Sequence, residues 1–296
     1  MKRHPALPAR VSAPAGSSGL VAKSYMVQTN NGGRIEPVPG FDIGRVMTQG
    51  FGSRRVPARL CAEQLGAAQW TEFAFPESVV GKDDRVPVSD TTRTPWRCVC
   101  QLVVDGLHDE QVLGTGWMAG PRTVLTAGHN LFSHRFGRAA TRITVLPGRH
   151  VDLAPFDLFR SRRFDVHPLW RSEGDEDHDL GVVWLDTAVG EHTGWFGFGS
   201  RPDAELQQLI VNTAGYPADK RLGTQWFNAG RVSAVAPGFI EYGLDTEPGQ
   251  SGSPIFAVNA DNERIVLAVH AYGGDSRNKG VRITDDVFDL LQSWLR

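Results

Sequence analysis

Cysteine, net charge and long apolar runs are all scarce in this sequence, and each shortage excludes a class of protein. The 296 residues include 3 cysteines, too few for a disulfide framework. The formal net charge of −2 at pH 7 is unlike that of a strongly basic nucleic-acid-binding domain. No apolar run approaches the roughly 18 residues that indicate a transmembrane helix. We therefore expect a soluble globular protein whose partners include neither nucleic acid nor membrane.

The three cysteines do not suggest a metal site either. Cys61, Cys98 and Cys100 contain no Cys-x-x-Cys pair and no Cys/His spacing of the kind that binds zinc. Cys98 and Cys100 would point to the same side of a strand, where a bridge across one intervening residue is strained. The sequence therefore predicts small buried or free thiols, with no metal and no cofactor.

The N-terminal part differs in composition from the rest. Residues 1–40 are rich in proline, glycine, serine and asparagine, which is typical of a loosely attached segment. Residues 1–20 are basic but lack the apolar core of roughly 7–15 residues that an ordinary secretory signal peptide contains. Residues 1–77 carry 9 of the 31 Lys and Arg and 5 of the 33 Asp and Glu, so a basic leader precedes an acidic body.

Short apolar runs separated by turn residues fill the chain from residue 79 onward. Glycine (33) and proline (18) are frequent, and each run has the length of a strand. This spacing predicts an all-β sandwich or barrel. The end of the chain differs, because Thr284 suits a helix N-cap, acidic residues follow it, and an apolar stripe continues to Leu295. We expect an all-β body closed by a C-terminal helix.

Three short motifs carry the residues of a nucleophilic hydrolase. His129 lies in the run LTAGHN, Asp179 opens the apolar run DLGVV, and Ser251 lies between glycines in GQSGSP. A serine hydroxyl needs a histidine to accept its proton, and the histidine needs a buried carboxylate on its other ring nitrogen. Gly249 lets the backbone turn so that the amides of Gly249 and Ser251 converge on one point, as an oxyanion hole requires.

The chain order His129, Asp179, Ser251 narrows the class of hydrolase. It is the order of chymotrypsin-like enzymes, whereas subtilisins run Asp, His, Ser and α/β-hydrolases run Ser, Asp, His. The α/β-hydrolase pattern Gly-x-Ser-x-Gly also fails, because Ser253 occupies its last position. Asp177 is the alternative acid, although no apolar strand follows it directly.

With these motifs the sequence resembles the chymotrypsin-fold serine proteases, and in detail the bacterial glutamyl endopeptidases. The similarity extends to SVVGKDDR at residues 78–85, GYPADK at 215–220, LAVH at 267–270, NKGVRIT at 278–284 and the C-terminal helix. It covers about residues 78–296 and implies a chymotrypsin/trypsin-like double β-barrel. It also implies that His129 is the general base, Asp179 the acid that orients it, and Ser251 the nucleophile.

The resemblance implies a preference for glutamate, and less so for aspartate, before the scissile bond. In the family, a Thr or Ser five residues before the nucleophile and a histidine after it bind the substrate carboxylate, and these positions hold Thr246 and His270 here. Both side chains can donate charge-assisted hydrogen bonds to a carboxylate. The free α-amino group of the mature chain, here Ser78, would add a positive charge near this pocket.

Departures from the family pattern leave another specificity open. Asp245 lies six residues before Ser251, where trypsin-like enzymes hold the acid that selects Lys or Arg. Asn130 stands where Cys or Val is common, and Pro248 stands where glycine is usual and restricts the residue before it. A protease with Lys/Arg preference set by Asp245 is therefore the alternative.

The resemblance further implies that the mature chain begins at Ser78, after cleavage of the Glu77–Ser78 bond. Residues 1–77 would then be an N-terminal propeptide, attracted by charge to a protease domain at residues 78–296, whereas the alternative is a simple linker. Because glutamate precedes this bond, the enzyme could process itself or a relative. We expect a monomer that acts on polypeptide substrates and is secreted or in the cell envelope, as the family is.

Two other functions would use the same fold. A non-catalytic binding protein has no need to keep His129, Asp179 and Ser251 together, and a chaperone-like periplasmic protease would carry a peptide-binding domain after the helix. We therefore predict a serine endopeptidase that forms an acyl-enzyme at Ser251.

Overall fold

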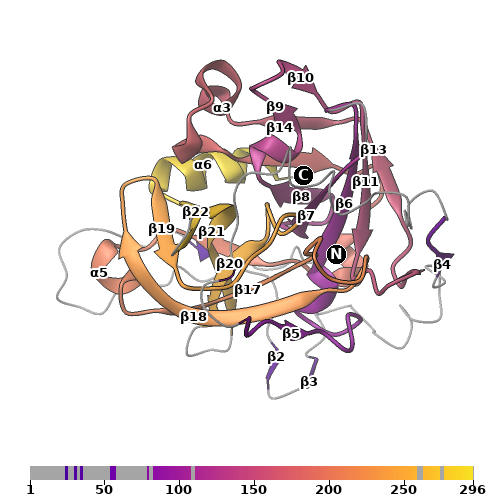
Figure 1. Ribbon diagram of the computed structural model, residues 1–296, viewed down its shortest axis with the longest axis horizontal. Helices are drawn as coiled ribbons and strands as arrows, with labels where there is room; N and C mark the ends of the chain where they lie inside the picture. The colour runs from indigo at the N-terminus through magenta and orange to yellow at the C-terminus, as the bar shows by residue number, and fades with distance from the viewer. Residues whose placement is uncertain are drawn as a thin grey trace, which may run out of the picture.

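The computed structural model describes residues 24–25, 30–31, 34–35, 54–57, 79, 83–107, 111–258, 263–273 and 277–295 (Figure 1). Most of this chain is β-structure arranged as two barrel-like sheets, which confirms the predicted all-β class. The expected cleavage point at Glu77 and Ser78 lies outside the described residues, as does Cys61.

The first sheet has seven strands, all paired antiparallel, in the spatial order β13-β11-β6-β7-β8-β15-β14. Its inner strands are rich in valine, leucine and threonine, residues that fit a pleated surface buried on one or both faces. The bounds are β6 Val99–Asp105, β7 Val112–Met118, β8 Thr123–Thr126, β11 Arg142–Pro147, β13 Phe159–Ser161, β14 Phe164–Val166 and β15 Gly181–Trp184.

The second sheet closes on itself. The path β21-β20-β17-β18-β19-β22 ends in a strand that also pairs with β21, so these six strands form a ring. Strands β16 and β1 extend the path beyond β21, and β5 pairs with β18. The bounds are β1 Ser24–Tyr25, β5 Val86–Pro87, β16 Gly197–Gly199, β17 Ile210–Gly215, β18 Trp226–Val235, β19 Phe239–Tyr242, β20 Pro254–Val258, β21 Arg264–Gly273 and β22 Asn278–Arg282.

The C-terminal helix α6 (Asp285–Trp294) is the one that the sequence predicts. The hydroxyl of Thr284 accepts a hydrogen bond from the Val287 backbone N–H, and two aspartates occupy the first turn. The apolar stripe of α6 packs into the same hydrophobic cluster as Trp117 of the first sheet and Phe256 of the second. One core therefore joins both sheets and the helix.

The remaining elements are short and mostly connect strands. They are β2 Asn30–Asn31, β3 Arg34–Ile35, β4 Arg54–Arg55, β9 Phe132–Ser133, β10 Arg138–Ala139, β12 Leu153–Ala154, α3 Pro168–Glu173, α4 Gly190–Thr193, α5 Asp203–Leu206 and the 3₁₀ helices η2 Trp96–Cys98, η3 Gly128–Asn130 and η4 Glu176–His178. None of the helices in the described ranges is long and apolar enough to cross a membrane.

Cys98 and Cys100 are buried free thiols, as predicted. Burial raises the pKa of Cys98 to about 12 and that of Cys100 well above its ordinary value. Because the thiolate is the reactive form, both residues are held in an inert state and serve the core of the first sheet.

The N-cap of α6 generates a prediction about stability. Replacement Thr284→Ala removes the side-chain oxygen that caps this helix, so we expect the free energy of unfolding to fall by about 1 kcal/mol. Urea unfolding followed by circular dichroism measures the change. Thr284→Ser keeps the hydroxyl and should retain most of the stability; equal losses in both variants would contradict the capping role.

Candidate active site

The closest polar contact of the site joins His129 and Asp179. His129 lies in η3, which follows β8, and Asp179 follows η4 at the start of β15, the neighbour of β8 in the sheet. Asp179 is 0% exposed; its Oδ2 lies 2.5 Å from His129 Nδ1 and its Oδ1 accepts the His129 backbone N–H at 2.7 Å. The carboxylate therefore fixes both the ring and the backbone of the histidine, with Nδ1 as the donor and Nε2 turned to the other side.

Gly128 is required for this approach. A Cβ atom there would lie 2.8 Å from Asp179 Oδ1 and 2.7 Å from the ring of Trp170. Both distances are shorter than side chains tolerate, so the glycine of the Ala-Gly-His motif lets Asp179 and His129 come together. The motif thus has a steric explanation in addition to its resemblance to known proteases.

A further hydroxyl reaches the same carboxylate. The Tyr272 O–H, from β21 of the second sheet, donates to Asp179 Oδ2 at 2.6 Å. Burial and the charge of Asp179 raise the pKa of Tyr272, so the phenol stays protonated and remains a donor. The role of Tyr272 could not be predicted, because no local sequence pattern indicates that its strand lies beside Asp179.

Asp177, the alternative acid, lies elsewhere. Its backbone N–H donates to Asp175 Oδ1, and its carboxyl group packs against Gly238, where a Cβ atom would clash with it. Although Asp177 and Asp179 are close in sequence, Asp177 lies within η4 and Asp179 at its end, and their side chains contact different residues. The structure therefore brings Asp179, and not Asp177, to the histidine.

Ser251 lies in a tight turn between β19 and β20, which we call the nucleophile turn (residues 249–252). Gly249 and Gly252 have φ values of +97° and +90°, in the region that favours glycine. A Cβ atom at Gly249 would lie 2.6 Å from the Tyr216 carbonyl oxygen, so close packing also demands glycine there. The carbonyl oxygen of Ser251 accepts the backbone N–H of Thr115, from β7 in the first sheet. Ser251 therefore lies at the seam where the two sheets meet.

The expected pocket residues Thr246 and His270 are both completely buried. His270 lies on β21, and its Nδ1 is 2.7 Å from the hydroxyl of Tyr242, on β19. Gly280, on the intervening strand β22, leaves room for that hydroxyl, because a Cβ atom there would lie 3.1 Å from it. A Tyr242 O–H that donates to Nδ1 leaves the ring proton on Nε2, from which it can be donated to an acid.

Thr246 offers a second donor. Its Oγ1 is buried and makes no hydrogen bond within the described part of the chain. A buried polar atom without a partner costs free energy, and such atoms are uncommon in native proteins. A ligand oxygen that accepts from this hydroxyl would remove the cost.

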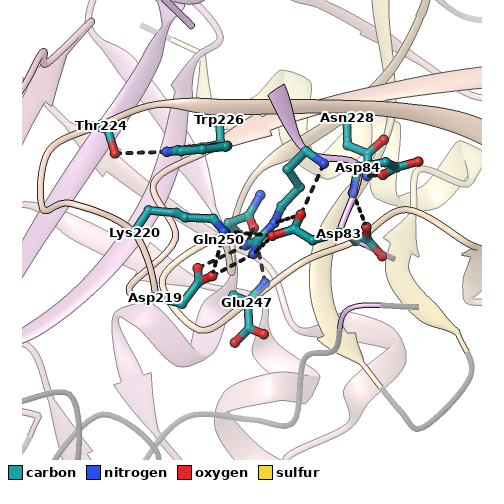
Figure 2. A network of polar contacts seen from close by, with 11 residues as sticks. Asp83, Asp84, Asp219, Lys220, Thr224, Trp226, Asn228, Glu247 and Gln250 are labelled. Atoms are coloured by element: carbon teal, nitrogen blue, oxygen red, sulfur yellow. Dashed lines mark hydrogen bonds and ion pairs between the residues drawn. The ribbon is translucent and has the colours of Figure 1, made fainter. Parts of the chain in front are cut away.

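Asp245, which would select Lys or Arg in the alternative specificity, binds the backbone at Asp84. It is 1% exposed, and its Oδ2 accepts the backbone N–H of Asp84 at 2.9 Å. Asn228 in turn donates to Asp84 Oδ1 at 2.7 Å (Figure 2). The carboxylate of Asp245 is therefore turned toward the chain at residue 84, and the Lys/Arg alternative is not favoured.

An ion-pair cluster surrounds this attachment (Figure 2). The side chain of Arg85, 1% exposed, contacts both oxygens of Asp219 at 3.0 and 2.6 Å and both oxygens of Asp83 at 2.9 Å. Its Nη1 also lies 3.4 Å from Oε1 of Gln250, the residue before Ser251. Lys220 donates to Asp83 at 2.7 Å. Hydrogen bonding by Arg85 holds the pKa of Asp83 well below its usual range.

The cluster joins two of the motifs that resemble the glutamyl endopeptidases. Asp83, Asp84 and Arg85 follow the expected mature start, and Asp219 and Lys220 end the run GYPADK. In the structure these segments meet beside Gln250. Ser78 itself lies outside the described residues.

No group of three or more His, Cys, Asp and Glu side chains in the described ranges is arranged to hold a metal ion. Burial lowers the pKa of His167 to about 4, and its Nδ1 accepts the Leu169 backbone N–H at the start of α3. That histidine is therefore a neutral helix cap.

Comparisons with known proteins agree with this geometry. Residues 114–266 match the family model described as a trypsin-like peptidase domain. The glutamyl endopeptidase of Bacillus licheniformis is 38% identical over 227 residues, covering 74% of this chain and 69% of that protein. A protein of Bacillus subtilis named extracellular metalloprotease is 33% identical over 220 residues, 74% of this chain and 70% of its own. A glutamyl endopeptidase of Staphylococcus epidermidis is 30% identical over 231 residues, 74% and 75% of the two chains.

Solved structures support the same fold. A glutamyl endopeptidase crystallised in complex with MPD superposes with a TM-score of 0.66 at 24% identity, over 73% of this chain and 98% of the other. A thermostable serine protease named AL20 gives a TM-score of 0.57 at 17% identity, over 67% and 95% of the two chains. The predicted double barrel is confirmed, and the chain belongs to the trypsin-like peptidase family, among the glutamyl endopeptidases and their relatives.

Proposed function

We propose that this chain is a serine endopeptidase that cuts polypeptides after glutamate through an acyl-enzyme on Ser251. The observation that carries the proposal is the buried Asp179, which holds the backbone and the ring of His129 at once. Such an arrangement leaves Nε2 to take the proton of Ser251 Oγ as the oxygen attacks the scissile carbonyl. The histidine then gives this proton to the leaving amine, and water repeats the cycle to release the acid.

The backbone amides of Gly249 and Ser251 complete the proposed machinery. The carbonyl oxygen of the substrate gains negative charge during attack, and fixed N–H donors stabilise it at no cost of reorganisation. The positive φ of Gly249 supports this role, because it turns the amide plane in a way that other residues avoid.

The preference for glutamate rests on the donors of the pocket. Thr246 supplies a buried hydroxyl without a partner in the described chain, and His270, hydrogen-bonded to Tyr242, can present an N–H. Two donors of this kind suit a carboxylate, whereas a Lys or Arg side chain would need the acid of Asp245, which accepts from Asp84 instead. The names of the relatives support the same preference.

We further propose that residues 1–77 are a propeptide and that cutting the Glu77–Ser78 bond produces the mature, monomeric enzyme outside the cytoplasm. Asp84 and Arg85, a few residues beyond this bond, are attached to Asp245 and Gln250 next to the pocket and the nucleophile. A new α-amino group at Ser78 would therefore begin a segment that ends at the site. The Bacillus subtilis relative is named as extracellular, which supports export.

The acid of the triad can be tested against its neighbour. Asp179→Asn should lower kcat by about 10⁴-fold, because an amide cannot hold the histidine in the required tautomer. Asp177→Asn is the matched control, with the same change two residues away and no contact to His129, and should leave kcat within about twofold of wild type. Steady-state rates on a peptide with glutamate before the scissile bond distinguish the two; equal effects would contradict the assignment.

Tyr242→Phe tests the pocket. Loss of the Tyr242 hydroxyl removes the hydrogen bond that keeps His270 Nδ1 as an acceptor and its Nε2 as a donor. We therefore expect kcat/KM to fall about tenfold for a peptide with glutamate before the cut. The matched glutamine peptide should lose much less, because it gains little from the imidazole donor. The ratio of the two values on one preparation does not depend on the fraction of active enzyme, and an unchanged ratio would contradict the role of Tyr242.

Processing and specificity can be read together by mass spectrometry. A denatured protein mixture digested with the purified chain should show cuts after glutamate, and the enzyme itself should acquire an N-terminus at Ser78. The Ser251→Ala variant should produce neither. Cuts after Lys or Arg would mean that Asp245 sets the specificity and would contradict the glutamate pocket. An absence of Ser251-dependent cuts, even from a chain that begins at Ser78, would overturn the proposed enzyme.

A further inference from the structure

The carbonyls of Gly249 and Ser251 in the nucleophile turn are held by Thr115 of the first sheet and by Asn130 of η3. The carbonyl oxygen of Gly249 accepts the hydroxyl of Thr115 at 2.8 Å. The carbonyl oxygen of Ser251 accepts the backbone N–H of Thr115 at 2.9 Å and the side-chain amide of Asn130 at 2.8 Å. These bonds cross the seam between the sheets, from residues that are far from the turn in sequence.

Asn130 is built into its position. It is buried, it follows the proposed base His129, and its Nδ2 also donates to Thr126 Oγ1 at 2.9 Å. Gly114 leaves space for it, because a Cβ atom at residue 114 would lie 2.7 Å from the amide carbon and oxygen of Asn130. The departure from the family pattern at residue 130 therefore places two amide N–H groups where they bind Thr126 and the nucleophile.

Thr115 is equally constrained. Its hydroxyl donates to Gly249 O and accepts the backbone N–H of Tyr216 at 3.1 Å, and its carbonyl oxygen accepts the hydroxyl of Thr126 at 2.7 Å. Because its hydroxyl has a partner on each side, its rotamer is fixed. The residue thus acts as a rigid connection between β7, β17 and the nucleophile turn.

The turn needs such external bonds. Gly249 and Gly252, at its two ends, have no strong backbone preference of their own, so neighbouring groups must set the peptide planes. The carbonyl of Gln250 accepts the Ser253 N–H, and the carbonyls of Gly249 and Ser251 are held by Thr115 and Asn130. A carbonyl shares its peptide plane with the N–H of the next residue, so fixing these three carbonyls also fixes the N–H groups of Gln250, Ser251 and Gly252.

We propose that Thr115 and Asn130 are positioning residues that hold the carbonyls of Gly249 and Ser251, and with them the nucleophile turn, in the orientation that Ser251 needs for attack. The inference rests on the proposed role of Ser251 as nucleophile. It assigns to these side chains an effect on the chemical step, and none on recognition of the substrate side chain, because neither contacts Thr246, His270 or Tyr242 among the interactions described above.

Thr115→Val is the decisive variant, since valine has the shape of threonine without the hydroxyl. On a peptide amide with glutamate before the cut, kcat should fall about tenfold or more while KM stays within about threefold. Thr115→Ser restores the hydroxyl and should recover most of kcat. Thr213→Val, in β17, is the matched control, because the buried Thr213 hydroxyl makes no hydrogen bond in the described chain; this variant should keep wild-type rates.

A second readout separates positioning from folding. The rate at which an organophosphonate without an acidic side chain modifies Ser251 should fall in parallel with kcat, while the urea midpoint shows that each variant is folded at the assay temperature. If Thr115→Val does not fold, Asn130→Ala decides in the same assays, because truncation introduces no clash and should also lower kcat severalfold at unchanged KM.

The outcomes are distinct. Folded Thr115→Val or Asn130→Ala variants with wild-type kcat, or equal losses in Thr115→Val and Thr115→Ser, would overturn the positioning role. Ser251→Ala in parallel tests the proposed function itself: if wild-type activity did not depend on Ser251, the proposed function would fail first. If activity is Ser251-dependent and the positioning variants are unaffected, only the present inference fails.

Discussion

The seam between the two sheets is the constraint on which the site depends. His129 and Asp179 lie beside strands of the first sheet, and Ser251 lies in a turn of the second, so the proposed triad requires that both sheets form and pack together. Bonds across the seam maintain this alignment: Tyr272 reaches Asp179 from the second sheet, and Thr115 reaches Ser251 from the first. Site geometry and inter-sheet packing are thus the same property of the molecule.

Burial of the Asp179 carboxylate shows how this packing is made compatible with charge. A fully buried carboxylate is costly unless hydrogen bonds replace its lost hydration. Here the backbone and ring of His129 and the phenol of Tyr272 supply three donors. These bonds stabilise the ionised acid, and they also direct it, because each oxygen has a defined partner. The arrangement that makes burial tolerable is the one that orients the histidine.

Hydrogen bonds also attach the residues after the proposed cleavage point to the residues around Ser251. Arg85 is buried between the carboxylates of Asp83 and Asp219 and contacts Gln250. The backbone N–H of the neighbouring Asp84 donates to the carboxylate of Asp245. Bidentate arginine–carboxylate pairs are among the more specific polar contacts, so the path of this segment is well defined. The segment that follows the proposed cleavage point therefore helps to shape the pocket wall and the nucleophile turn.

Local sequence determined the class of fold, the C-terminal helix and the three residues of the proposed triad. Strand periodicity, the Thr284 cap and the chain order of His129, Asp179 and Ser251 are properties of short stretches, and chemistry limits which residues they can contain. The buried strand after Asp179 already favoured it over Asp177, and in the structure Asp179 is the one that contacts His129.

Tertiary structure alone decided which distant side chains complete the site. Tyr272, Tyr242 and Thr115 reach it from strands whose neighbours are set by sheet closure, and no local pattern records which strands become neighbours. Asn130 departs from the family pattern, and the structure shows that the absence of a side chain at Gly114 leaves the space that Asn130 fills. Periodicity tells which face of a strand is buried; only packing of the whole chain tells what that face meets.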